Sequence, residues 1–122
     1  MIKYSPVSFD KLPEPYCLDK SVSGYIGYDM NQDGKECGFS VFKLYGYTME
    51  IIDVVSNSDD ETKEGFIRSS LNYGANRGTY IAFYKAKNAI DVAKKLGFKE
   101  NNNNVLEGEI PDLLAGHCGR CK

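Results

Sequence analysis

The sequence lacks tryptophan, has a single histidine and contains no long apolar segment. No stretch approaches the roughly 20 consecutive apolar residues of a membrane-spanning helix, so we expect no membrane segment and no membrane partner. Lysine and arginine number 15 against 17 aspartates and glutamates, and they form no basic run. Because nucleic-acid binding needs concentrated positive charge, the sequence predicts no nucleic-acid partner.

The first ten residues contain no continuous apolar segment before Asp10 and Lys11. A secretory signal has such a segment, so we expect a cytoplasmic protein. The cytosol is reducing, and the four cysteines are therefore expected to be thiols or metal ligands. A length of 122 residues is that of one domain with one core.

Three of the four prolines, Pro6, Pro13 and Pro15, lie within residues 1–20. Proline fixes φ and lacks the amide hydrogen, which disfavours a long helix. We predict that residues 1–20 form an irregular lead-in to a core of residues 21–110, followed by a C-terminal tail of residues 111–122.

Residues 21–55 alternate in polarity with a period of two, which is typical of strands. The sequence Asn-Gln-Asp-Gly at 31–34 and Gly46 suit tight turns between them. The pattern predicts a three-stranded antiparallel meander. Its last strand, 48–55, contains Ile51, Ile52, Val54 and Val55, which make it apolar on both faces around Asp53, so we expect it at the centre of the sheet.

Helical periodicity follows the meander. Ser58 and Glu61 have capping-box spacing before a helix predicted over 60–76, which ends before Gly78. A buried strand over 79–84, a helix over 86–96 and a terminal hairpin around the asparagines 101–104 come next. Because the first helix permits parallel pairing of the strands on either side of it, these elements predict an α+β domain with a mixed sheet.

Two helical segments carry a resemblance to a known family. The first reads Phe-Ile-Arg-Ser-Ser-Leu-Asn-Tyr-Gly-Ala-Asn-Arg-Gly at 66–78, and the second reads Ala-Ile-Asp-Val-Ala-Lys-Lys-Leu-Gly-Phe at 89–98. Their order and spacing resemble the core of the GNAT family of acyl-CoA N-acyltransferases, from residue 21 to residue 110. The resemblance implies a GNAT-like fold, acetyl-CoA as cofactor, and a small amine or a protein lysine as acceptor.

The resemblance also implies site residues. Some enzymes of the family use a carboxylate on the central strand to deprotonate the acceptor amine, so Glu50 and Asp53 are the candidate catalytic residues. Main-chain contacts to the pantetheine arm of CoA would fall at Val54 and Val55. Lys63 is the candidate cation near the CoA diphosphate.

Departures from the family pattern favour an alternative function. The loop expected to hold the diphosphate, 58–63, contains no glycine and has three consecutive acids, Asp59, Asp60 and Glu61. The tyrosine that the family frequently places on the second helix as an acid is replaced by Ala93. The alternative is a catalytically silent binding or regulatory module with this fold that does not bind CoA.

The C-terminal tail ends in a CxxC pair with the sole histidine beside it. His117, Cys118 and Cys121 predict a zinc site, because the two-residue gap lets both thiolates turn toward one ion, and Cys17 or Cys37 would supply the fourth ligand. A redox-active dithiol and a tail without a role are the alternatives.

Aromatic residues are concentrated in the meander. They are too many to point into one small core, so we expect some to line a groove or a surface that forms a homodimer, with scattered exposed tyrosines as the alternative. The residues concerned are Tyr25, Tyr28, Phe39, Phe42, Tyr45 and Tyr47.

Overall fold

The computed structural model describes residues 1–120, and from residue 116 to residue 120 it describes the backbone alone. The strands are β1 (Ile2–Ser8), β2 (Val22–Asp29), β3 (Lys35–Tyr45), β4 (Thr48–Ser56), β5 (Ile81–Tyr84), β6 (Lys99–Glu100) and β7 (Leu106–Glu109). The helices are α1 (Asp60–Ala75), α2 (Ile90–Leu96) and α3 (Ile110–Arg120), with short 3₁₀ turns η1 (Phe9–Lys11), η2 (Tyr16–Leu18) and η3 (Met30–Gln32).

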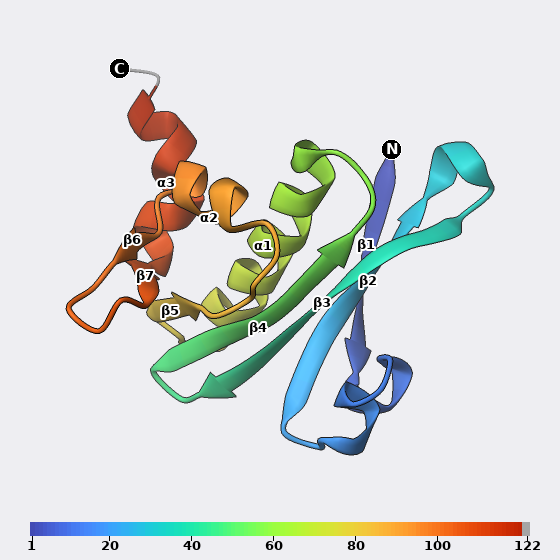
Figure 1. Ribbon diagram of the computed structural model, residues 1–122, viewed down its shortest axis with the longest axis horizontal. Coiled ribbons are helices and arrows are strands. Elements are labelled where there is room, and N and C mark those ends of the chain that lie inside the picture. The colour runs from blue at the N-terminus through green and yellow to red at the C-terminus, as the bar shows by residue number, and fades with distance from the viewer. Residues whose placement is uncertain (121–122) are drawn as a thin grey trace.

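The strands form one mixed sheet in the order β1-β2-β3-β4-β5-β7-β6 (Figure 1). Strands β2, β3 and β4 are the predicted antiparallel meander, and β4 lies at the centre of the sheet. Strand β5 pairs parallel to β4 after the α1 crossover, and β6 and β7 form the terminal hairpin. The predicted α+β class and mixed sheet are therefore confirmed.

The main core lies between the sheet and the three α-helices, which contact one another. Its fully buried members from the meander include Phe42, Ile51 and Val54, and those from α1 include Phe66 and Leu71. The amphipathic spacing of α1 places these side chains toward the sheet. The helices thus cover one face of the strands.

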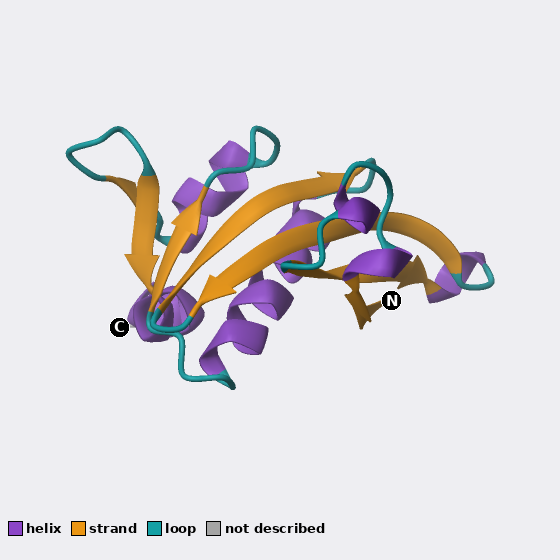
Figure 2. Ribbon diagram, turned by 90° about the horizontal axis from the view of Figure 1, so that it is seen from below, coloured by secondary structure: helices purple, strands orange, loops and turns teal. Residues whose placement is uncertain are grey.

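A smaller core covers the opposite face. Leu12, between η1 and η2, packs with Val22 and Val41 of the sheet, and Tyr16 and Phe39 border this cluster. Figure 2 shows the two turns lying against the strands. The central strand is therefore covered on both faces, as its apolar sequence predicted.

The prediction of an irregular lead-in over residues 1–20 was wrong for its first part. Strand β1 pairs with β2 along its whole length, from Ile2 opposite Asp29 to Ser8 opposite Ser23. Pro6 is tolerated because β1 is an edge strand, where one row of amide positions has no neighbouring strand to bond.

The capping of α1 and the extent of two other segments differ from the predictions. The N-cap of α1 is Asp59 and not Ser58, because the Asp59 carboxylate accepts the bond from the Thr62 N–H. Helix α2 begins at Ile90 and not at residue 86, because Ala89 has a left-handed φ of 58°. Helix α3 runs from Ile110 to Arg120, within the segment predicted to be a C-terminal tail.

Of the helices within residues 1–120, none is long and apolar enough to cross a membrane.

Candidate functional site

Strands β4 and β5 run together and then separate. Their pairing extends from Thr48 opposite Ile81 to Ile51 opposite Tyr84, and the Lys85 N–H donates to the Ile51 carbonyl at 2.8 Å. From residue 53 to residue 56, β4 pairs with β3 but not with β5. The edge of β4 that faces β5 therefore has no strand partner over these residues, and we call this unpaired edge the β4–β5 opening.

A bulge in β4 lies where the two strands separate. Val41 pairs with Asp53 while Phe42 pairs with Ile51, so Ile52 is an extra residue in β4. A bulge changes the direction of the side chains that follow it. Consequently Asp53 shares the face of Val41, away from α1.

Asp53 is held by a tyrosine from the lead-in. The Tyr16 hydroxyl of η2 donates to Oδ2 of Asp53 at 2.6 Å, and the Tyr16 ring lies 6.3 Å from that of Phe39. Burial, and then the bond to Asp53, raises the pKa of Tyr16 to about 12. Tyr16 therefore remains a hydrogen-bond donor to the carboxylate at neutral pH.

Tyr84 is the last residue of β5 that pairs with β4, opposite Ile51. Its hydroxyl donates to the Asn88 carbonyl at 2.6 Å. Burial raises the pKa of Tyr84 well above its ordinary value, and the nearby charge of Asp53 raises it further. Tyr84 is thus a neutral core residue at the point where the strands separate, and it is 3% exposed.

Glu50, the second predicted carboxylate, has other partners. Its Oε2 lies 2.7 Å from the Nζ of Lys85, and its Oε1 accepts a long bond of 3.4 Å from Tyr45. The ammonium group of Lys85 neutralises the Glu50 carboxylate. Asp53, whose carboxylate accepts a hydrogen bond from a neutral phenol, is therefore the stronger candidate base.

The predicted cofactor contacts lie on β4 and α1. Val54 is 1% exposed and belongs to the main core, so only its main chain is available to a ligand. Val55 is half-buried, and both valines lie in the part of β4 that β5 does not pair. Lys63 is in the first turn of α1, with Nζ 4.0 Å from Oδ1 of Asp60.

The N-terminus of α1 carries its own anion. Oδ1 of Asp59 accepts bonds from the Thr62 N–H at 2.9 Å and from the Thr62 hydroxyl at 2.8 Å. These two bonds lower the pKa of Asp59, so its carboxylate is charged at neutral pH. A helix N-terminus binds anions through such N–H groups, and Asp59 occupies one of them.

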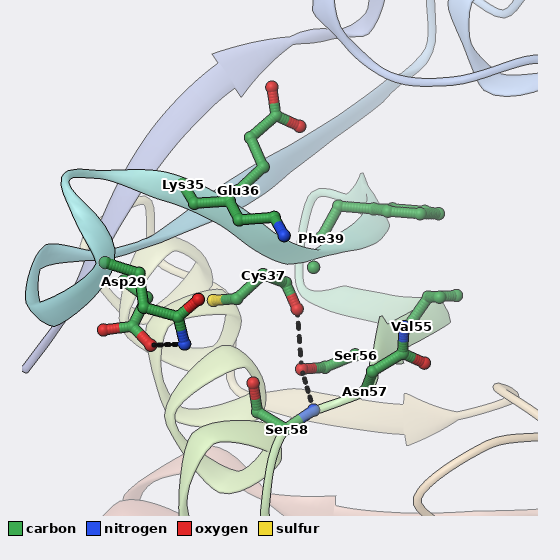
Figure 3. Close-up of a pocket in the computed structure, with 11 residues that line it drawn as sticks. Asp29, Lys35, Glu36, Cys37, Phe39, Val55, Ser56, Asn57 and Ser58 are labelled. Atoms are coloured by element: carbon green, nitrogen blue, oxygen red, sulfur yellow. Dashed lines mark hydrogen bonds between the residues drawn. The ribbon is translucent and has the colours of Figure 1, made fainter.

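A cleft of about 470 Å³ lies beside the loop from β4 to α1 (Figure 3). Ser56 donates to the Cys37 carbonyl at 2.8 Å, and the Ser58 N–H donates to Oγ of Ser56 at 3.1 Å. The cleft is also lined by Asp29. Burial and the charge of Asp29 raise the pKa of the Cys37 thiol, which is therefore protonated at neutral pH.

The predicted zinc site falls mainly outside what the structure describes. Cys121 lies beyond the described residues, and the side chains of His117 and Cys118 are not described either. Cys17 and Cys37 are half-buried thiols. Among the side chains that are described, no three or more His, Cys, Asp or Glu lie together in a way that would hold a metal. Zinc binding remains a prediction.

The meander aromatics divide between core and surface. Tyr25 packs against the main core, whereas Tyr45 and Tyr47 are 52% and 64% exposed. Tyr47 stacks on Tyr80, with ring centroids 5.8 Å apart. Surface tyrosines are therefore present as expected, and their use in a homodimer stays a prediction.

Comparison with known proteins identifies the fold. No protein-family model matches the sequence, and no curated protein matches it. Among solved structures, the ribosomal-protein-S18-alanine N-acetyltransferase from Escherichia coli matches with a TM-score of 0.67 and 11% identity, over 90% of this chain and 94% of that one. A KacTA–DNA complex matches with a TM-score of 0.67 and 12% identity, over 98% and 99% of the two chains.

A third match has a bound cofactor. The PaiA N-acetyltransferase from Thermoplasma acidophilum in complex with coenzyme A has a TM-score of 0.60 and 11% identity, over 75% of this chain and 63% of that one. The chain therefore has the fold of the GNAT acetyltransferases. At these identities the likeness concerns the fold, and activity has to be argued from the site.

Proposed function

We propose that this protein is an N-acyltransferase that acylates a small amine or a protein lysine with an acyl-thioester donor. The observation that carries the proposal is the position of Asp53. Its carboxylate lies on the bulge where β4 and β5 separate, held by Tyr16. A carboxylate at this point suits deprotonation of an amine beside the thioester of the donor.

The fit of CoA differs between the two parts of that cofactor. The pantetheine arm carries amide groups, and these suit the main chain of Val54 and Val55 in the β4–β5 opening. The diphosphate does not suit the N-terminus of α1, where Asp59 already accepts from Thr62. When bound, the donor supplies the acyl group as a thioester, and no part of the proposal depends on the diphosphate.

The protein residues have distinct roles in this proposal. Asp53 accepts the proton of the acceptor amine at Oδ1, since Oδ2 is bonded to the Tyr16 hydroxyl. The amine nitrogen bonds to the acyl carbon as the carbon–sulfur bond of the thioester breaks, the leaving thiolate takes a proton from solvent, and Asp53 returns its proton to solvent. Tyr16 fixes the direction of the carboxylate. Glu50 acts with Lys85 as a structural ion pair across β4 and β5.

The first test replaces Asp53. Full-length protein is assayed by mass spectrometry for acetyl transfer from acetyl-CoA to a panel of primary amines, and then as Asp53→Asn. General-base catalysis contributes about 100-fold or more, so kcat is expected to fall by at least that factor. Glu50→Gln is the matched control and should retain kcat within about threefold. An active Asp53→Asn variant would contradict the assignment.

A second candidate function is a binding module that does not use CoA. The charged Asp59 cap favours this binding module, because the Asp59 carboxylate already occupies the Thr62 N–H, a donor at the helix start that could otherwise bind a diphosphate. Titration of the full chain with acetyl-CoA separates the two functions. Saturable binding with a Kd below about 100 μM, or −5 kcal/mol or better, supports the acyltransferase.

A further inference from the structure

We infer that this site selects its donor by the pantetheine arm and gains no affinity from the donor's diphosphate. The inference rests on the proposed function and specifies its donor. Three features of the loop from β4 to α1, residues 57–63, carry it: the bonds its amide groups already make, the sign of its charges and the conformation of its backbone.

The amide groups of this loop are partly committed to the chain itself. The Thr62 N–H donates to the Asp59 carboxylate at 2.9 Å, and the Ser58 N–H donates to the Ser56 hydroxyl at 3.1 Å. A diphosphate at the start of α1 would have to displace the Asp59 carboxylate from Thr62. That exchange replaces one anion by another and therefore contributes little to the binding free energy of the diphosphate.

The charges around the loop are mainly negative. Asp59, Asp60 and Glu61 follow one another, and the Lys63 ammonium lies 4.0 Å from Asp60. A second cleft of about 560 Å³, on the β1 side of the loop, is lined by Asp29, Asp59 and Glu61. A diphosphate placed beside the start of α1 would face these like charges.

The backbone of the loop also lacks the conformation that cradles phosphates. An anion nest alternates right-handed and left-handed residues so that successive N–H groups converge. The nearest residues of the described chain with positive φ are Gly46 before the loop and Gly78 after it, and none lies within residues 57–63. The loop therefore does not form a nest.

The β4–β5 opening retains what the pantetheine arm needs. From residue 53 to residue 56 the edge of β4 that faces β5 is unpaired by that strand. An extended arm with two amide groups can add to such an edge in the manner of a strand. The β4–β5 opening and the acidic loop are separate features. A loop that does not bind the diphosphate therefore leaves the opening able to bind the pantetheine arm.

The experiment compares donors with and without the diphosphate. Acetyl-CoA and S-acetyl-pantetheine are titrated into the full chain and observed by ligand-detected NMR, with calorimetry where affinity permits. We expect Kd values within about threefold of each other. Binding of acetyl-CoA more than tenfold tighter would overturn the inference and leave the proposed function standing. Binding of neither donor would overturn both.

A charge-neutral variant tests the cause. Asp59→Asn keeps a capping oxygen for Thr62, and it is combined with Asp60→Asn and Glu61→Gln. This triple variant should bind acetyl-CoA at least fivefold more tightly at low salt and bind S-acetyl-pantetheine unchanged. Unchanged acetyl-CoA affinity would overturn the inference that this loop repels the diphosphate.

The matched control removes the same number of negative charges at positions outside the loop. It replaces exposed acids outside the loop by Asp10→Asn, Glu14→Gln and Asp112→Asn. This control should leave the Kd of acetyl-CoA within about twofold of the parent value. Circular dichroism of both triple variants establishes that each is folded before the titrations are compared.

Discussion

At the scale of single residues, the bond between Tyr16 and Asp53 separates the two carboxylates of the central strand. Glu50 is neutralised by the Lys85 ammonium, whereas Asp53 receives a phenol hydroxyl at 2.6 Å. A neutral donor orients a carboxylate without removing its charge. The geometry therefore favours Asp53 as the base and makes Tyr16 its positioning residue.

Replacing Tyr16 by phenylalanine should lower kcat while keeping the ring against Phe39. A hydrogen bond to a charged group is worth about 1.5–3 kcal/mol, so we expect kcat to fall about tenfold or more with the KM for the donor unchanged. In an Asp53→Asn background the same change should have no further effect on kcat. An equal fall in kcat on Tyr16→Phe in the parent and in the Asp53→Asn variant would assign Tyr16 a purely structural role.

Tyr28→Phe provides the control for this change. It also removes a phenol hydroxyl, at the end of β2 and away from the bulge in β4. Tyr16→Phe should lower the free energy of unfolding by no more than about 3 kcal/mol, the upper worth of a hydrogen bond to a charged group, and Tyr28→Phe by about 1 kcal/mol or less. Circular dichroism establishes that both variants are folded. A loss of kcat in Tyr16→Phe alone then reports on Asp53.

At the scale of elements, the segment containing η1 and η2 is part of the fold and not a surface arm. Leu12 is 4% exposed, and a side chain at Gly24 would come within 3.1 Å of it, so the absence of a Cβ at Gly24 gives Leu12 its space. The segment covers the face of the sheet that carries Asp53. Its packing therefore determines whether Tyr16 reaches that residue.

Leu12→Ala should lower the free energy of unfolding by about 2–4 kcal/mol, because it removes a buried side chain and leaves a cavity. Urea unfolding of the full chain measures the change. Leu18→Ala, in the same segment but 76% exposed, should change it by about 0.5 kcal/mol or less. Equal effects of the two variants would mean that the segment does not pack as described.

The elements that the sequence predicted well are those whose signal is local. The period-two pattern of residues 21–55 and the helical spacing after Ser58 each lie within a short window, and both were confirmed. Strand β1 was missed because Pro6 argues against it locally, and the pairing with β2 that stabilises it is more distant in sequence. The late start of α2 depends on the left-handed φ of Ala89, which no residue type there signals.

At the scale of the whole molecule, the site was less predictable than the fold. Asp53 could be named as a candidate because the family resemblance implies a carboxylate on the central strand, but its partner Tyr16 lies 37 positions away in a segment predicted to be irregular. The acidic loop was visible in the sequence, whereas the bonds from Asp59 to Thr62 required the structure. The fold therefore does not by itself determine the chemistry at the start of α1.

Two half-buried phenols couple the N-terminal segment to the rest of the molecule and predict how stability depends on alkaline pH. Tyr4 donates to the Thr62 carbonyl at 2.9 Å, and Tyr16 donates to Asp53. Burial is the main cause that raises both pKa values from 10.0 to about 12. Since the folded values exceed the unfolded ones, this contribution to stability is complete below pH 10 and is lost as the pH rises toward 12.

Urea unfolding at a series of pH values checks this window. The free energy of unfolding should fall between about pH 10 and pH 12, because the unfolded chain releases these two protons first. In the Tyr4→Phe/Tyr16→Phe variant the free energy of unfolding should fall less over this pH range. The difference from the parent separates the contribution of the two phenols from that of the lysines, which also titrate there. If the variant and the parent lose stability in parallel over this range, the two phenols do not link the N-terminal segment to the fold in the way described.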